Sequence, residues 1–288
     1  RDSDGNVVWI PGSLKCVKGI GWFIEEYGVA QISMNLTNIV VTPVHAAFDE
    51  VDRCARERGI RTTGSELVGL IPLSAMLDAA DHYLAKQQRS LGISDAEKIK
   101  IAVKSMGLDE LGPFVPEEKI IEYVLAKGEP KKLVDLTVTE FTNVTASESV
   151  APGGGSVAAQ LGALGAALGT MVANLGAHKR GWDDRWQFFS DHAVAGKANM
   201  DELVRLVDAD TDAFNAIMDS FRLPAGSDAE KAAKAAAVDA ATRLAIETPL
   251  RTMEVCVDSM ATIKAMAEHG NPASVSDAGV GALCARSG

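Results

Sequence analysis

Three consecutive glycines, Gly153, Gly154 and Gly155, lead directly into a helical segment of small apolar residues that opens with Ser156. Glycines can adopt positive φ and leave their N–H groups uncovered, and a serine can cap the first turn of a helix. The positive end of the helix dipole faces the same place. This turn predicts a binding site for an anion or a polarised carbonyl. The alternative is a sharp structural corner, since the turn has neither P-loop nor Rossmann spacing.

A carboxylate, Asp210, interrupts the apolar stripe of the helical segment 200–222. The stripe has three- and four-residue spacing with one gap, which Asp210 fills, so we expect Asp210 on the buried face and Asp208 and Asp212 in solvent. Burial raises the pKa of a carboxylic acid, and a neutral acid near pH 7 can act as a general acid. A structural carboxylate held by a buried arginine or by backbone donors is the alternative. The stripe consists of Leu203, Val207, Phe214, Ile217 and Phe221.

The overall charge favours small-molecule partners. A formal charge of −11 argues against nucleic acid or an anionic membrane as the main partner, because both require a basic surface. The apolar run 157–173 is shorter than a membrane span of about 20 residues, and Gln160 and Thr170 interrupt it. Its glycines predict a core helix that its neighbours approach closely.

The cysteines and histidines predict neither a metal site nor a disulfide framework. The four cysteines lack Cys-x-x-Cys spacing, and the five histidines form no His-x-x-x-His pair, so each histidine is expected at the surface or at a helix end. Reduced thiols are typical of the cytoplasm, where we expect this protein. The cysteines are Cys16, Cys54, Cys256 and Cys284.

Strand and helix patterns alternate in the first part of the chain. Residues 29–36 and 65–71 predict strands. Alternation in segments this short predicts a two-layer α/β sandwich. Helices are expected at 43–55, 73–84, 94–107 and 116–126.

The second part of the chain shows only helical patterns. Capping boxes at Thr137 with Glu140 and at Ser227 with Glu230 precede helix-length apolar stripes. The segment 127–132, which contains a glycine, a proline and four charges, is the best linker. We therefore expect a multidomain α+β chain, with a partial two-layer α/β sandwich at 1–130 and an all-α helical bundle at 131–288.

Three motifs of the second part, at 147–159, 207–210 and 270–277, resemble formiminotetrahydrofolate cyclodeaminase in their order and residues. The resemblance implies that Asp210, the second aspartate of Val-Asp-Ala-Asp, is the proton donor. It also implies a set of folate-binding residues, namely Gly153, Gly154, Gly155, Ser156, Asn271 and Asp277.

The first part resembles the C-terminal subdomain of glutamate formiminotransferase, through residues 19–22, 30–37, 42–45 and 64–72. The order of the two parts is that of the bifunctional formiminotransferase-cyclodeaminases of histidine degradation. In that family the transferase histidine lies in an N-terminal subdomain. We expect this chain to be a fragment that lacks it and stops before the last cyclodeaminase helices, so its activity alone should be impaired.

The resemblance implies a two-step reaction with tetrahydrofolate as co-substrate and no metal. The formimino group moves from N-formimino-L-glutamate to N5 of tetrahydrofolate. N10 then attacks the formimino carbon, and ammonia leaves once its nitrogen is protonated, which gives 5,10-methenyltetrahydrofolate. Which part of the folate the glycine turn contacts stays open.

Several basic residues are candidate contacts for an anionic polyglutamate tail, with solvated surface charges as the alternative. They are Lys15, Lys18, Lys179 and Arg180. We also expect a homo-oligomer, because Val280, Leu283 and Cys284 form an apolar stripe that needs cover. The competing functions are a non-catalytic folate-binding or scaffold fragment and a helical interaction domain without a ligand.

Overall fold

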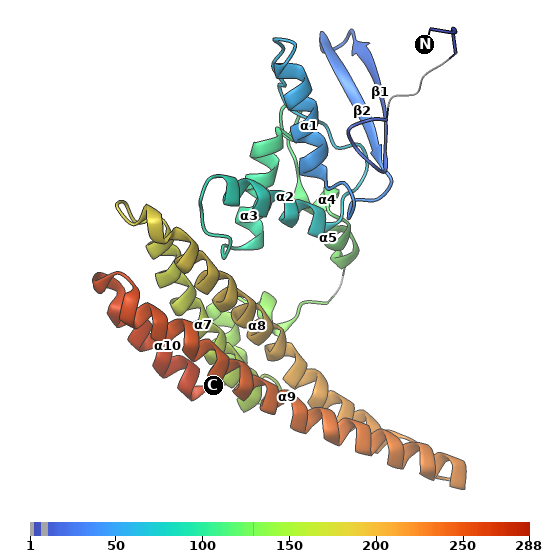
Figure 1. Cartoon of the computed structure of the whole chain (residues 1–288). Coiled ribbons are helices and arrows are strands. Elements are labelled where there is room, and N and C mark those ends of the chain that lie inside the picture. Colours follow the sequence, from blue (N-terminus) through green and yellow to red (C-terminus); the bar gives the residue numbers. More distant parts are fainter. Residues whose placement is uncertain (1–2, 7–10, 129) are drawn as a thin grey trace. The chain divides into compact units, whose positions relative to one another are not determined.

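The computed structural model describes residues 3–6, 11–128 and 130–288 (Figure 1). These residues form two compact units, Arg1–Gln87 with Asp95–Lys127, and Gln88–Ser94 with Gly128–Gly288. The described residues are mostly helical, with one small two-stranded sheet in the first unit and a helical bundle in the second. The two units are described separately below.

The sheet of the first unit is an antiparallel hairpin of β1 (Val17–Ile24) and β2 (Val29–Leu36). Gly28, at φ +65°, turns the chain between them. The strand predicted at 29–36 is confirmed. The sequence did not predict β1, because Gly19 and Gly21 have low strand propensity and mask its alternation.

Four helical segments were predicted in the first unit, and three match single helices. They are α1 (Val44–Arg56), α2 (Leu73–Lys86) and α3 (Asp95–Met106). The fourth is split into α4 (Pro116–Lys119) and α5 (Ile121–Ala126) by Ile120, whose backbone is extended. Ile120 is fully buried in a core with Met76 and Met106, which explains why the chain breaks the helix there.

The strand predicted at 65–71 is wrong. Ser65 donates its N–H to Gly107 O, and the rest of the segment is irregular until Ile71, which forms an isolated parallel bridge with Ile120. Two of the apolar side chains that suggested a strand are in solvent, with Val68 83% and Leu70 51% exposed, whereas Leu67 and Ile71 contact the core. Alternation alone is insufficient where no neighbouring strand supplies hydrogen-bond partners.

The second unit is a bundle around α7 (Gly154–Ala177), which packs against α8 (Trp186–Arg222), α9 (Asp228–His269) and α10 (Val275–Ser287) (Figure 1). The prediction of a helical second part is confirmed, and both capping boxes form. The shorter elements are η1 (Leu133–Asp135), α6 (Val138–Thr145), η2 (Asp183–Arg185) and η3 (Pro272–Ser274).

Helix α7 is approached closely by its neighbours, as its glycines predicted. A Cβ at Gly165 would lie 2.7 Å from the Ala285 backbone nitrogen, and one at Gly169 would lie 2.9 Å from Ile263 Cγ1. By length and composition α7 could also cross a membrane, but 56% of its most apolar window is buried inside this structure. Its small residues therefore have a packing reason within the bundle.

Helices α8 and α9 extend beyond α7 as a two-helix arm (Figure 1). The stripe predicted on α8 is buried at Leu203 and Val207, but Phe214 is 41% and Phe221 is 56% exposed. The expectation of a continuous buried stripe is therefore wrong beyond Asp210, because α7 begins at Gly154 and leaves that end of α8 uncovered.

Residues 88–94 belong to the helical unit, although they lie between α2 and α3 in the sequence. Asn174 of α7 accepts a hydrogen bond from Ser90 Oγ at 2.6 Å and donates one to Gly92 O at 2.9 Å. The Leu91 N–H donates to Ser190 Oγ of α8 at 3.0 Å. This segment, called the 88–94 strap below, thus satisfies buried polar groups of the bundle.

Candidate functional site

The glycine turn begins α7 without positive φ. Gly153 is the N-cap, with φ −95° and ψ −169°, and Gly154 is the first helical residue. The expectation that the three glycines adopt left-handed backbone is wrong, since none of them has positive φ. Ser156 does not cap the helix either. It lies in the first turn and is fully buried.

Asp210 of α8 meets this turn. Its Oδ2 accepts hydrogen bonds from the Ser156 N–H at 2.9 Å and from Ser156 Oγ at 3.1 Å. The Ser156 N–H is one of the backbone donors that the first turn of a helix leaves without an intrahelical partner, and a carboxylate there also interacts favourably with the helix dipole. The structure therefore brings together Asp210 and Ser156, which are 54 residues apart in the sequence.

Asp210 remains available for a ligand. It is half-buried, and its Oδ1 accepts no hydrogen bond from any residue that the structure describes. A backbone donor is also what a structural carboxylate would have, so the contact with Ser156 does not by itself assign chemistry. It does place a carboxylate oxygen at the turn that contains half-buried Gly153 and exposed Gly154, where an added Cβ would meet no atom within 4 Å.

Asp208 has a defined partner, contrary to the prediction of a solvated charge. Its Oδ1 accepts a hydrogen bond from the Leu133 N–H at 2.7 Å, and its Oδ2 accepts one from the Val134 N–H at 3.4 Å. Asp208 thus anchors η1, at the start of the second unit, to α8. Asp212 is exposed, as expected.

Asn271 and Asp277 lie far from Asp210 within the chain. Asn271 Oδ1 accepts a hydrogen bond from Lys179 Nζ at 3.1 Å, just beyond the C-terminal end of α7. Asp277 is in the first turn of α10, which runs antiparallel to α7. Because α7 rises about 1.5 Å per residue, roughly 30 Å separate these residues from Ser156. The six folate-binding candidates therefore form two groups at opposite ends of α7.

The Asn271 end is basic and aromatic. Lys179 Nζ lies 4.0 Å from the centroid of the Trp182 ring, and the Arg185 guanidinium lies 4.6 Å from the same centroid. Arg185 also donates to His269 O at 3.3 Å. Lys179 is thus tied to Asn271 and Trp182, and it is more than a solvated charge.

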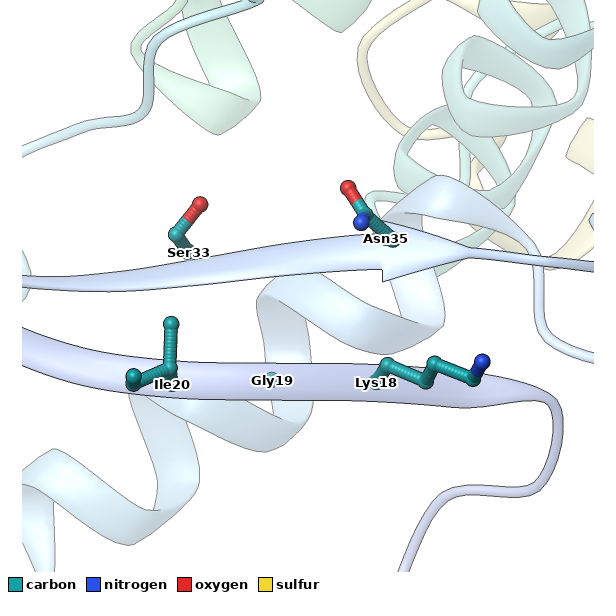
Figure 2. Close-up of a pocket in the computed structure, with 5 residues that line it drawn as sticks. All are labelled: Lys18, Gly19, Ile20, Ser33 and Asn35. Atoms are coloured by element: carbon teal, nitrogen blue, oxygen red, sulfur yellow. The ribbon is translucent and has the colours of Figure 1, made fainter.

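An open pocket of about 230 Å³ lies on the hairpin of the first unit (Figure 2). Lys18 is paired with Asn35, and Ile20 with Ser33, so the four side chains share one face of the two strands. Lys18 was a candidate contact from the sequence. Asn35 and Ser33 were missed, because only the register with β1 brings them beside Lys18.

A partly buried polar cluster on α1 and α2 was also missed. Asp49 accepts hydrogen bonds from His82 Nε2 at 3.0 Å, Tyr83 OH at 3.1 Å and Lys86 Nζ at 2.9 Å. The His82 ring stacks on His45 at 4.3 Å. Burial, aided by the neighbouring His82, lowers the pKa of His45. Partial burial opposes ionisation of Asp49, but its three donors outweigh that and lower its pKa.

This cluster predicts a loss of stability in mild acid. The pKa of folded His45 lies below its ordinary value of 6.5, so the unfolded chain binds more protons as the pH falls below that value. Stability is full above about pH 6.5 and declines below it, by on the order of 1 kcal/mol or less for this group. Asp49 contributes only in stronger acid. His45→Phe should keep the ring stack and flatten the pH dependence, measured by urea unfolding at pH 7.5 and 5.5. An unchanged slope in the variant would contradict this assignment.

Two family profiles match the chain, one in each part of the sequence. The family profile described as "Formiminotransferase domain" matches residues 1–126, and "Formiminotransferase-cyclodeaminase" matches residues 137–288. The formimidoyltransferase-cyclodeaminase of Gallus gallus is 42% identical over 274 residues, which are 94% of this chain and 50% of that protein. The chain therefore spans about half the length of this relative.

Two further relatives each match about half of the chain. The methenyltetrahydrofolate cyclohydrolase of Methylorubrum extorquens is 36% identical over 152 residues, which are 53% of this chain and 73% of that protein. The crystal structure of formiminotetrahydrofolate cyclodeaminase from Thermotoga maritima has 28% sequence identity and a TM-score of 0.45, and covers 52% of this chain and 71% of that chain. The profile match over residues 137–288, more than half of the chain, shows that the chain belongs to the formiminotransferase-cyclodeaminase family.

Proposed function

We propose that the helical unit converts 5-formiminotetrahydrofolate into 5,10-methenyltetrahydrofolate and ammonia, as the second step of a folate-dependent, two-step enzyme of histidine degradation. The observation that supports this most is the contact of Asp210 with the first turn of α7. It sets a carboxylate beside uncovered glycine backbone, where a polar ligand can approach. Membership of the family supports the same reaction class.

In this proposal Asp210 moves one proton. N10 attacks the carbon of the protonated formimino group, which forms the N10–C bond and makes N10 cationic. Asp210 takes the proton that N10 releases and gives it to the amino nitrogen. The C–N bond to that nitrogen then breaks, ammonia leaves, and the positive charge stays on the methenyl group. Hydrogen bonds from Ser156 stabilise the carboxylate whenever Asp210 is deprotonated.

The glycine turn would hold the folate through the backbone of Gly153, Gly154 and Gly155. Asn271, with Lys179 and Arg180, would bind an anionic part of a folate at the other end of α7, and Asp277 would accept a hydrogen bond from an N–H or O–H group of the same folate. The distance between these ends means that one short substrate cannot touch both within one chain. We therefore propose that the two ends of α7 contact different parts of one long polyglutamate substrate, or substrates bound to different copies of this chain.

For the first unit we propose a contribution to formimino transfer from N-formimino-L-glutamate to tetrahydrofolate. The pocket lined by Lys18, Ser33 and Asn35 offers one cation and polar side chains for a carboxylate. The hairpin would be one part of a two-layer α/β sandwich, in which further strands pair with its free edges.

A second candidate activity is hydrolysis of the methenyl group, because the Methylorubrum relative is named methenyltetrahydrofolate cyclohydrolase. Asp210 would then move a proton from attacking water. An assay separates the two: the chain is incubated with 5-formiminotetrahydrofolate or with 5,10-methenyltetrahydrofolate, while ammonia release and methenyl absorbance are followed. Ammonia release favours cyclodeamination, and loss of methenyl absorbance favours hydrolysis. Folate binding without turnover of either compound favours the non-catalytic alternative.

We also propose a cytoplasmic homo-oligomer. The four cysteines are free thiols in the structure, and α10 exposes 51% of Val280 and 64% of Leu283. Leu283→Lys should weaken self-association by about tenfold in Kd, because a charge would enter an apolar contact. Sedimentation over a concentration series measures this. A wild-type chain that stays monomeric at every concentration would contradict the proposal.

A further inference from the structure

Ser156 directs both of its donors to one acceptor on another helix. Its side chain is fully buried, and its N–H and Oγ both reach Asp210 Oδ2. A serine in the first turn usually bonds to its own helix, whereas here the contact crosses from α7 to α8. Two bonds to one oxygen fix the position of that oxygen.

Gly155 leaves the space that the other oxygen occupies. A Cβ at position 155 would overlap with Asp210 Oδ1, whereas a Cβ at Gly153 or Gly154 would meet nothing within 4 Å. Of the three glycines, only Gly155 is therefore required by contact with Asp210. Since the overlapping atom ends a movable side chain, an alanine there would turn the carboxyl group away and leave the helix intact.

Thr211 supports the hydroxyl of Ser156. Its Oγ1 lies 3.4 Å from Ser156 Oγ, and either atom can donate. If Thr211 donates, the hydrogen of the Ser156 hydroxyl is free to point to Asp210. Three neighbouring groups thus act on one carboxylate.

We propose that Gly155, Ser156 and Thr211 form a seat that holds Asp210 in the orientation for proton transfer, so that Gly155 and Ser156 are positioning residues and the Ser156 hydroxyl does not bind folate. This inference rests on the proposed role of Asp210. It explains the geometry of the turn by the need to hold the proton carrier, in addition to any backbone contact with the substrate.

Ser156→Ala tests the seat through the pH dependence of Asp210. The variant loses one donor to the carboxylate and keeps the backbone donor, so the limb of the pH–rate profile that Asp210 controls should move to higher pH by about one unit. The carboxyl carbon of Asp210, followed by NMR in ¹³C-labelled protein, should show the same displacement of its titration midpoint. Ser259→Ala is the control, because Ser259 is equally buried but bonds only to Val255 O of its own helix.

Gly155→Ala tests the space for Oδ1. The rate of methenyl formation should fall by about 10²-fold, because even small misplacement of a catalytic group is costly. Circular dichroism should show an unchanged helix content. Gly279→Ala, at an exposed position of α10 where a Cβ meets nothing, is the matched control and should keep the wild-type rate.

The two proposals fail in different ways. If Ser156→Ala moves the NMR midpoint but the wild-type chain turns over no folate, the seat stands and the reaction is wrong. If Asp210→Asn slows the reaction but Ser156→Ala leaves the profile and the NMR midpoint unchanged, the seat is wrong. Adding Ser156→Ala to Asp210→Asn should slow turnover less than about twofold further, since Ser156 acts through Asp210. A larger additional loss would also overturn the seat.

Discussion

Replacing Asp210 by asparagine is expected to lower the rate of methenyltetrahydrofolate formation by about 10²- to 10⁴-fold, the usual contribution of a positioned general acid or base. Asparagine keeps the size of the side chain and one oxygen that can accept from Ser156. It cannot take up and return a proton. The formimino transfer proposed for the first unit should survive, since it does not use this proton. Methenyl absorbance and ammonia release in a stopped assay measure the effect.

The aspartates on either side of Asp210 supply the controls. Asp212→Asn changes an exposed carboxylate of the same helix and should leave the rate within about twofold. Asp208→Asn should cost stability before activity, because Asp208 holds the N–H groups of Leu133 and Val134. Loss of activity in Asp208→Asn together with full activity in Asp210→Asn would show that the proton carrier has been assigned to the wrong residue.

Gly92→Ala is expected to destabilise the helical unit by about 3 kcal/mol. A Cβ at position 92 would overlap with the backbone carbonyl group of Ala193 in α8, and backbone cannot move aside as a side chain can. The strap would be forced away, and Asn174 and Ser190 would lose their partners. The free energy of unfolding from urea titration measures this.

The control for Gly92→Ala is Gly112→Ala. Gly112 also lies outside the helices, but a Cβ there would meet nothing within 4 Å, and its backbone is not left-handed. Its unfolding free energy should change by less than about 0.5 kcal/mol. Equal effects in the two variants would mean that the close approach of Gly92 to Ala193 does not limit stability.

The helices of this chain could be predicted wherever their ends carry local chemistry. Thr137 and Ser227 form the reciprocal hydrogen bonds that their capping boxes required, and Pro43 precedes α1. Strand β2 followed from alternation. These features depend on residues at most a few positions apart, so the sequence contains all the information they need.

The predictions that failed concern features that depend on partners elsewhere in the fold. The strand expected at 65–71 lacks a neighbouring strand, and β1 gains its pairing only from β2. Ser156 has the residue type of a cap, yet its hydroxyl is taken by a carboxylate on another helix. The separation of Asn271 from Asp210 follows from the length of α7, which one sequence motif cannot reveal. Helical register did predict that Asp210 faces the bundle.

The 88–94 strap has a consequence for dissecting the chain. Because these residues belong to the helical unit but precede the linker, no single cut yields two complete units. A chain that starts at residue 128 would keep helices α7, α8, α9 and α10 and leave Asn174 and Ser190 without the groups they bind. A relative that has no such strap must therefore bind these polar groups with other residues if its helical unit is to fold alone. A helical unit expressed from residue 128 onward should be less stable than the same unit in the whole chain. A synthetic peptide of residues 88–94 should restore part of that stability.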